Sequence, residues 1–145
     1  MIPDFDENNN LPPGIYEAEW QEFCDKYGYT KHRKQLLEGL EEAMNHLRSV
    51  GCRCIWVDGS FITAKHRPND FDVCWDEEGV EIPFLEVMHP VFLDFDNKRE
   101  RQKAIYGGEF FEHKGTAIRN PKRTYFDFFQ LDREDNPKGL IKIML

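Results

Sequence analysis

The sequence lacks any apolar run approaching the roughly 20 residues that a helix needs to cross a bilayer, so no membrane association is expected. Its start, Met1–Glu7, has neither a basic segment nor an apolar stretch, which argues against a secretory signal and predicts a cytoplasmic protein. None of the four cysteines forms a C-x-x-C pair, and Cys52 and Cys54 have poor spacing for zinc. Reduced, buried thiols are therefore predicted. No repeat and no low-complexity segment is present.

Basic residues are also in deficit, because 19 Lys and Arg stand against 27 Asp and Glu, for a net charge of −8. Phosphate contacts dominate nucleic-acid affinity, so such a chain is a poor general nucleic-acid binder. Two local basic runs, residues 97–103 and 114–123, either face phosphates or are solvated charges. At 145 residues, 40% of them hydrophobic, the chain suits a single domain with a compact core.

The chain is predicted to consist of an extended N-terminal arm, residues 1–16, and one domain, residues 17–145. The arm has little periodicity and three prolines, and we expect it to pack on a sheet or helix edge of its own or another subunit. Helical spacing predicts a helix over residues 17–27 and a second from the capping Thr30 to Gly51. The second helix has one apolar stripe, formed by Leu36, Leu37, Leu40, Met44 and Leu47.

The second half of the chain reads mainly as strands. Residues 80–95, broken by two prolines, receive no assignment, and Asp96 is expected to cap a basic helix over 97–106. The predicted strands are residues 52–57, 70–75, Glu109–Phe111, Thr124–Leu131 and 140–145. This order predicts an α+β domain, with a small mixed β-sheet and helices packed on one side.

The candidate chemistry lies between Val57 and Trp75. A strand leads to a Gly59-Ser60 turn, and the next strand carries Asp70-x-Asp72. Alternation along a strand puts both carboxylates on one side, where they repel unless a cation lies between them. Mg²⁺ fits, because it prefers oxygen ligands and often bridges carboxylates to substrate phosphates. Glycine permits close approach to a ligand, and serine adds a hydroxyl and an amide.

Gly-Ser, then nine residues, then Asp-x-Asp resembles the signature of the DNA polymerase β-type nucleotidyltransferase superfamily. The resemblance implies a nucleotidyltransferase-like domain in which Gly59 and Ser60 hold nucleotide phosphates. It also implies that Asp70 and Asp72 bind two Mg²⁺ ions. The implied activity moves a nucleoside monophosphate from a nucleoside triphosphate to a protein or RNA acceptor. The alternative for these residues is a hairpin-like turn with two solvated aspartates.

A second resemblance covers nearly the whole chain. The opening IPDFDENNNLPPGI, a DGSFxTxK-like stretch from Asp58 and an FFQ-like segment at Phe128–Gln130 are similar to an uncharacterised family of small bacterial and prophage proteins. That family brings no established activity. Small members of the nucleotidyltransferase superfamily occur in toxin–antitoxin modules, which implies a toxin or antitoxin partner. The competing hypothesis is a catalytically inactive nucleotidyltransferase-like binding protein, antitoxin-like or regulatory.

Several charged residues are further candidates. Lys65 and Arg67 lie between the turn and the Asp pair, where they either contact the nucleotide or are exposed loop charges. The same two alternatives, nucleotide contact or solvated helix end, apply to residues 32–34 at the start of the second predicted helix. The superfamily usually adds a third carboxylate. We predict Asp127, because an acid amid the aromatic residues of a strand is costly to bury without a partner. Asp94 or Asp96, or no third acid, are the alternatives.

Overall fold

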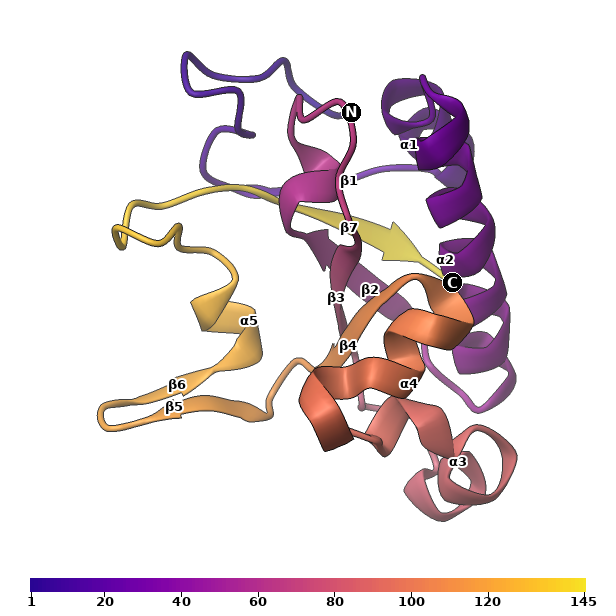
Figure 1. The fold of residues 1–145 in the computed structure, drawn as a ribbon. Coiled ribbons are helices and arrows are strands. Elements are labelled where there is room, and N and C mark those ends of the chain that lie inside the picture. The colour runs from indigo at the N-terminus through magenta and orange to yellow at the C-terminus, as the bar shows by residue number, and fades with distance from the viewer.

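The computed structural model describes residues 1–145 as a five-stranded sheet, a separate two-stranded sheet and the helices around them (Figure 1). No helix combines the length and the apolar character needed to span a membrane. In chain order the elements are β1 (Ile15–Glu17), α1 (Trp20–Tyr27), α2 (Lys31–Ser49), β2 (Cys54–Asp58), the 3-10 helix η1 (Ser60–Ile62), β3 (Phe71–Trp75), α3 (Ile82–Met88), the 3-10 helix η2 (Pro90–Leu93), α4 (Asp96–Tyr106), β4 (Gly108–Glu112), β5 (Thr116–Arg119), β6 (Lys122–Thr124), α5 (Tyr125–Phe128) and β7 (Leu140–Met144).

The main sheet has the strand order β1-β7-β2-β3-β4. Strand β2 is antiparallel to β3 and β7, whereas the pairs β3–β4 and β1–β7 are parallel. The sheet is therefore mixed, as predicted. Helices α1 to α4 lie on one side of it, and only the one-turn helix α5 and the β5–β6 hairpin lie on the other (Figure 1). The predicted α+β fold class is confirmed.

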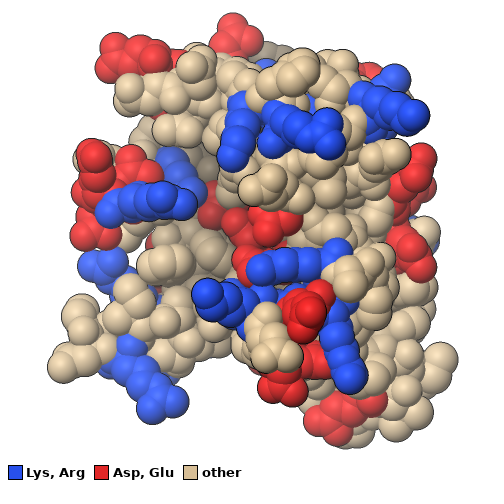
Figure 2. Space-filling view, in the orientation of Figure 1, with Lys and Arg blue, Asp and Glu red and all other residues tan.

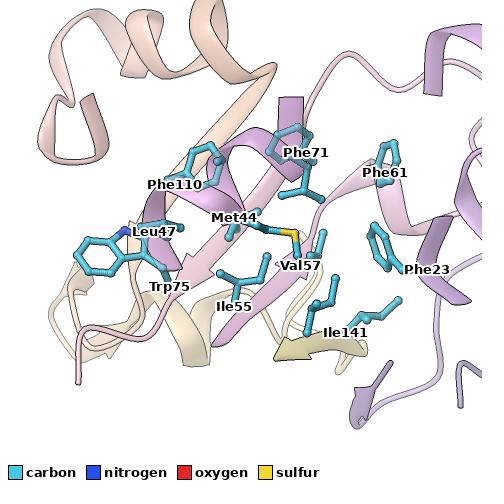
Figure 3. Packing of buried hydrophobic residues seen from close by; sticks show 14 of the residues in the cluster. Phe23, Met44, Leu47, Ile55, Val57, Phe61, Phe71, Trp75, Phe110 and Ile141 are labelled. Atoms are coloured by element: carbon cyan, nitrogen blue, oxygen red, sulfur yellow. The ribbon is translucent and has the colours of Figure 1, made fainter. Parts of the chain in front are cut away.

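The main core lies between the sheet and the long helices. Thr30 Oγ1 accepts a hydrogen bond from the N–H of Arg33 at 3.0 Å and so caps α2, as predicted. The apolar stripe of α2 packs against the side chains that β2 and β3 direct toward it (Figure 3). Burying one such large side chain stabilises the fold by about 1.5–3 kcal/mol. The residues drawn include Met44 and Leu47 of α2 and Ile55, Val57, Phe71 and Trp75 of the sheet.

The opposite face of the sheet carries a smaller apolar cluster, formed by Cys54, Trp56, Cys74, Phe111, Phe129 and Leu140. All four cysteines of the chain are free. Side chains two residues apart on a strand share a face. Asp58 follows Trp56 by two residues and Asp72 precedes Cys74 by two, so both carboxylates lie on this second face. Glu109, two residues before Phe111, joins them.

The prediction of a strand over Thr124–Leu131 is wrong. Strand β6 ends at Thr124, whose Oγ1 accepts a hydrogen bond from the N–H of Asp127 at 3.1 Å and caps the helical turn α5. Tyr125 and Phe129 are four residues apart and both pack on Phe111, with ring centroids 4.5 and 5.2 Å away. The aromatic spacing therefore serves a helical turn, which brings residues i and i+4 to one side.

The start of α4 also differs from the prediction. Asp96 is the first residue of this helix rather than its cap, and the N-cap position is Phe95, whose side chain makes no capping bond. Residues 97–99 have φ values of 51°, 57° and 64°, in the left-handed region. That conformation costs roughly 1–2 kcal/mol for each residue that is not glycine. Residues 80–95, left unassigned by the sequence, contain α3 and η2.

The N-terminal arm packs on its own subunit. Ile2 and Leu11 are buried in the main core, with 8% and 2% of their surface exposed. The arm ends in β1, which pairs with β7 in the register Ile15 to Leu140. This arm therefore forms one edge of the sheet.

Candidate functional site

The turn after β2 brings the backbone against a carboxylate of β3. Gly59 has φ 90° and ψ −171°, a conformation essentially restricted to glycine. A Cβ atom at Gly59 would lie 2.6 Å from Asp72 Oδ2, so any side chain would collide with that carboxylate. Ser60 begins η1, and its carbonyl accepts hydrogen bonds from the N–H and the hydroxyl of Thr63. The glycine backbone is thus held directly beside Asp72.

A buried arginine supports this turn from within the fold. Arg33 of α2 is fully buried, and its Nη1 donates to the carbonyls of Phe61 at 2.7 Å and Tyr27 at 3.3 Å. Its Nη2 donates to the carbonyls of Thr63 at 3.0 Å and Lys65 at 2.5 Å. The planar guanidinium presents several donors in a fixed fork, which suits this set of carbonyls. Arg33 is therefore a positioning residue for the turn, neither a nucleotide contact nor a solvated helix end.

Three neighbouring strands place carboxylates in one row. Asp58 of β2 is paired in register with Asp72 of β3, and Asp72 is paired with Glu109 of β4. Asp70, one residue before β3, lies on the same side as Asp72. Asp58, Asp70 and Asp72 line a cavity of about 710 Å³, together with Ser60 and residues of the loop after α5.

Burial and crowding make these carboxylates hard to ionise. The pKa of Asp58 is raised by burial, although the charge of Lys138 and the N–H of Gly59 oppose the shift. The pKa of Asp70 is raised by burial and by the charge of Glu109, against the pull of Lys103 and Lys65. Ionisation of Asp58 and Asp70 is therefore costly even beside these lysines.

Asp72 and Glu109 form a hydrogen-bonded carboxyl pair whose pKa values shift in opposite directions. The pKa of Asp72 is raised well above its usual range, first by burial, then by its hydrogen bond with Glu109 and by the neighbouring charges. Burial alone would raise the pKa of Glu109, but its hydrogen bond with Asp72 and the cations Lys103 and Arg99 outweigh burial and lower it. The proton therefore resides on Asp72 at a pH where Glu109 is ionised.

Cations flank the row at both ends. Lys138 Nζ lies 3.1 Å from Asp58 Oδ1, an ion-pair distance without hydrogen-bond geometry, so this buried oxygen lacks a hydrogen-bond partner. At the other end Arg99 Nε and Lys103 Nζ lie 3.2 and 3.1 Å from Glu109 Oε1. Figure 2 shows acidic side chains recessed in a hollow of this face, with basic side chains on two sides of it.

The structure brings most of the sequence-predicted residues together. Gly59, Ser60, Lys65, Asp70 and Asp72 all line the same cavity.

The remaining candidates lie elsewhere. Arg67 is exposed and does not line this cavity, and Asp127 is exposed on α5 and does not line it either. The assignment of Asp127 depended on a strand that the chain does not form. Asp94 and Asp96 line a different cavity, beside α4, where Asp94 is 3.5 Å from Arg101.

Two functional candidates escaped the sequence analysis, namely Asp58 and Glu109. Asp58 directly precedes Gly59 at the end of a strand that the sequence does predict, so its position was a usable signal. Glu109 lies in a predicted short strand, but the sequence does not say which strand β4 pairs with. Only the parallel pairing of β4 with β3 brings Glu109 beside Asp72.

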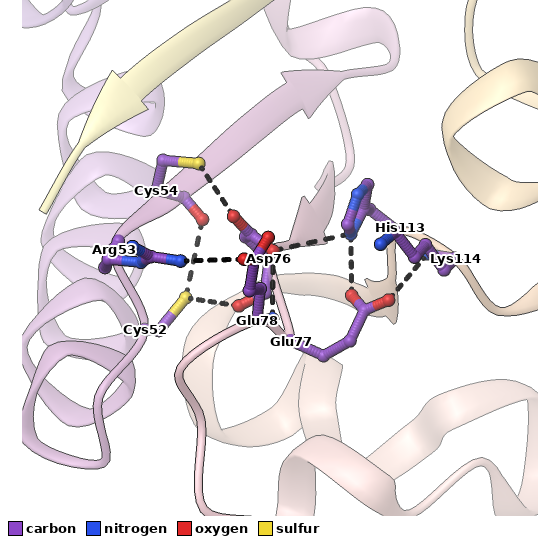
Figure 4. A network of polar contacts seen from close by, with 8 residues as sticks. All are labelled: Cys52, Arg53, Cys54, Asp76, Glu77, Glu78, His113 and Lys114. Carbon is purple, nitrogen blue, oxygen red and sulfur yellow. Dashed lines mark hydrogen bonds and ion pairs between the residues drawn. The ribbon is translucent and has the colours of Figure 1, made fainter.

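A second polar cluster lies at the opposite end of β3, where Asp76, Glu77 and His113 offer ligand atoms within 4.8 Å of one another (Figure 4). His113 Nδ1 is 2.7 Å from Glu77 Oε2 and 3.8 Å from Asp76 Oδ1. The Cys54 thiol donates to Asp76 Oδ2 at 3.7 Å. These contacts tie together the start of β2 and the segments that follow β3 and β4, which is a structural role.

The donor set of the main cavity suits a hard divalent cation. Its candidate ligands are oxygens of carboxylate, hydroxyl and amide groups, which Mg²⁺ prefers, and no thiol or imidazole lines the cavity. The buried Asp58 Oδ1 already has a positive partner, the ammonium of Lys138 at 3.1 Å, although that contact lacks hydrogen-bond geometry. The glycine at position 59 leaves open the space that a side chain would fill beside Asp72. Asp58, Asp70 and Asp72 thus offer the type of donor that Mg²⁺ prefers, whereas the group whose ligand atoms all lie within 4.8 Å of one another is Asp76, Glu77 and His113.

Comparison with family models gives one match, over residues 3–144, to a family described as "Family of unknown function (DUF6932)". No curated protein matches the chain, and no solved structure matches it.

Proposed function

The chain belongs to this family of unknown function, and we propose that it is a Mg²⁺-dependent nucleotidyltransferase. It would move a nucleoside monophosphate from a nucleoside triphosphate to the hydroxyl of a protein or RNA acceptor. The observation that carries the proposal is that Asp58, Asp70 and Asp72 line one cavity together with Gly59 and Ser60. Glu109 lies beside Asp72 on the neighbouring strand β4. A cavity of about 710 Å³ is within the size range of nucleotide-sized ligand sites.

Each part of the cavity has a role in this reaction. The backbone at Gly59 and the hydroxyl of Ser60 would hold phosphate oxygens, and Lys65 would neutralise part of the triphosphate charge. Asp58, Asp70 and Asp72 would hold the two Mg²⁺ ions. When bound, such ions stabilise charge on the attacking and leaving oxygens. We assign to Asp58, which is paired in register with Asp72, the third-carboxylate place that the sequence predicted for Asp127.

The proposed reaction exchanges one phosphorus–oxygen bond for another. The acceptor oxygen forms a bond to the α-phosphorus, and the bond from this phosphorus to the bridging oxygen breaks. Pyrophosphate leaves with the electron pair of that bond. The proton of the acceptor hydroxyl passes to a carboxylate of the row. Arg33 contributes by fixing the turn rather than by touching substrate.

A second candidate function is a nucleotidyltransferase-like binding protein without turnover, such as an antitoxin-like partner in a toxin–antitoxin or phage-related module. One observation favours it: Lys138, Arg99 and Lys103 already neutralise Asp58 and Glu109, so part of the row is compensated without a metal. In that case the cavity would bind a nucleotide or a partner, and no label would be transferred.

The decisive experiment offers α-labelled nucleoside triphosphates with Mg²⁺ to the protein, with total RNA and total protein as acceptors. The proposal expects label in one acceptor pool with the wild type and none with the double variant Asp70→Asn and Asp72→Asn. Asp127→Asn is the matched control, since it removes an exposed carboxylate outside the cavity and should keep wild-type activity. Nucleotide binding without any transfer would favour the second candidate. Equal labelling by the double variant would refute the first.

A further inference from the structure

The β5–β6 hairpin is an unusual segment in an acidic protein. Residues 113–126 contain Lys114, Arg119, Lys122 and Arg123 and no acidic residue, in a chain whose net charge is −8. The hairpin forms its own two-stranded sheet and projects from the body of the protein (Figure 1). Figure 2 shows basic side chains at the lower left, where Figure 1 places this hairpin.

Most of these cations are free to meet an anion. Lys114, Arg119 and Lys122 are exposed and form no ion pair within the protein. Arg123 lies 3.6 Å from Asp135, which itself lines the carboxylate cavity, so the base of the hairpin is tied to the cavity wall. None of the large exposed apolar side chains of the protein lies in the hairpin. The hairpin therefore lacks the apolar anchors that dominate protein–protein contacts.

The hairpin leads directly to the cavity. Strand β6 ends at Thr124 and α5 begins at Tyr125, so no linker separates the basic strands from the cavity wall. Phe128 of α5 lines the cavity and is 40% exposed, which leaves a ring face for a ligand. Arg133 and Lys65 also line this cavity. The basic hairpin and the aromatic side chain of Phe128 that lines the cavity are thus adjacent in the chain.

We propose that the hairpin cations Lys114, Arg119 and Lys122, together with Phe128, bind a single-stranded polynucleotide. Cations that track phosphates and aromatic rings that stack on unpaired bases are the usual means of binding single strands. A terminal hydroxyl of that strand would be the acceptor, so this reading of the acceptor rests on the proposed nucleotidyltransferase function. The binding itself does not. RNA and DNA share the required phosphates and bases, and the test separates them.

The test measures fluorescence anisotropy of labelled single-stranded RNA and DNA oligonucleotides of one sequence, from about 50 to 200 mM salt. Each phosphate contact contributes about 0.7 to the slope of log affinity against log salt for single strands. The variant Lys114→Gln, Arg119→Gln and Lys122→Gln should therefore bind at least tenfold more weakly, with a slope lower by about 2. Phe128→Ala should weaken binding about tenfold with little change in slope, because a stacked base carries no salt-dependent contact.

The matched control removes three exposed cations from α2, on the other side of the sheet, as Lys31→Gln, Lys34→Gln and Arg48→Gln. It changes the net charge equally and should bind within twofold of the wild type. Equal weakening by both triple variants, no binding of either oligonucleotide, or equally tight binding of a labelled acidic peptide would each overturn the proposal. If the proposal holds, the oligonucleotide that binds more tightly, RNA or DNA, identifies which polynucleotide the hairpin prefers.

The double variant Asp70→Asn and Asp72→Asn separates the two proposals. It should keep oligonucleotide binding, because it removes no hairpin cation. If the wild type binds oligonucleotides through the hairpin but transfers no label, the proposed reaction fails and the binding surface stands. If label reaches an RNA acceptor equally well in the hairpin variant, the hairpin does not bind the acceptor strand and the reaction stands.

Discussion

Gly59→Ala is the substitution for which the structure gives the sharpest expectation. The φ and ψ values of Gly59, 90° and −171°, lie in a region that alanine adopts only under strain of about 1–3 kcal/mol. The added Cβ would also lie 2.6 Å from Asp72 Oδ2, so either the turn or the carboxylate must move. Together we expect a loss of about 3 kcal/mol, which lowers Tm by roughly 6–12 °C for a chain of this length.

The assay combines thermal unfolding with calorimetric titration of Mg²⁺ and a nucleoside triphosphate. Gly59→Ala should lose stability and also lose nucleotide binding, because the same atom displaces Asp72. Gly79→Ala is the control. Gly79 also has positive φ, at 87°, but a Cβ atom there would lie nearest to the Gly51 carbonyl, at 3.2 Å. Gly79 follows the end of β3 that is opposite the carboxylate row. It should lose stability and keep nucleotide binding. A Gly59→Ala protein with wild-type Tm and wild-type nucleotide affinity would refute the reasoning.

Three further expectations follow from buried charges. Asp72→Asn should become more stable relative to the wild type as pH rises above about 4. The folded-state pKa of Asp72 is raised, so native Asp72 binds more protons than unfolded Asp72, and the wild type loses free energy of unfolding as pH rises. Parallel curves of Tm against pH for the two metal-free proteins would contradict this. Lys138→Met should cost about 2 kcal/mol in urea unfolding by leaving Asp58 without its ion pair, and adding Asp58→Asn should restore most of it; no recovery in the double variant would refute the coupling. Arg33→Lys should cost at least about 3 kcal/mol in urea unfolding, because one ammonium cannot satisfy the buried carbonyls of Phe61, Thr63 and Lys65; a loss below about 1 kcal/mol would contradict the positioning role.

Elements with one strong periodic signal could be predicted from the sequence. The apolar stripe of α2 has a single helical reading, and its cap at Thr30 forms as expected. Strand β2 follows from a continuous apolar run, and the alternation of side chains along the next strand places Asp70 and Asp72 on one side. These local signals were enough to locate the cavity, because its turn and its Asp pair come from one continuous stretch.

The segment 124–131 was mispredicted because its aromatic residues satisfy two periods at once. They alternate as a strand would, and they also recur four residues apart, at Tyr125 and Phe129, as a helical turn requires. Two contacts favour the turn: the cap that Thr124 provides, and the packing of both rings on Phe111, which is distant in sequence. The third-carboxylate prediction failed to join the cavity for the same reason, since it relied on the wrong period.

The choice between Asp58 and Glu109 as the additional ligand depends on what already occupies their oxygens. Glu109 Oε1 is engaged by both Arg99 and Lys103, and its carboxylate also shares a hydrogen bond with Asp72. Asp58 is more deeply buried, and its Oδ1 has only the off-geometry contact with Lys138. A metal can therefore gain more from Asp58 than from Glu109. On this argument Asp58 completes the ligand set, and Glu109 holds two cations at the edge of the row, where a triphosphate would need them.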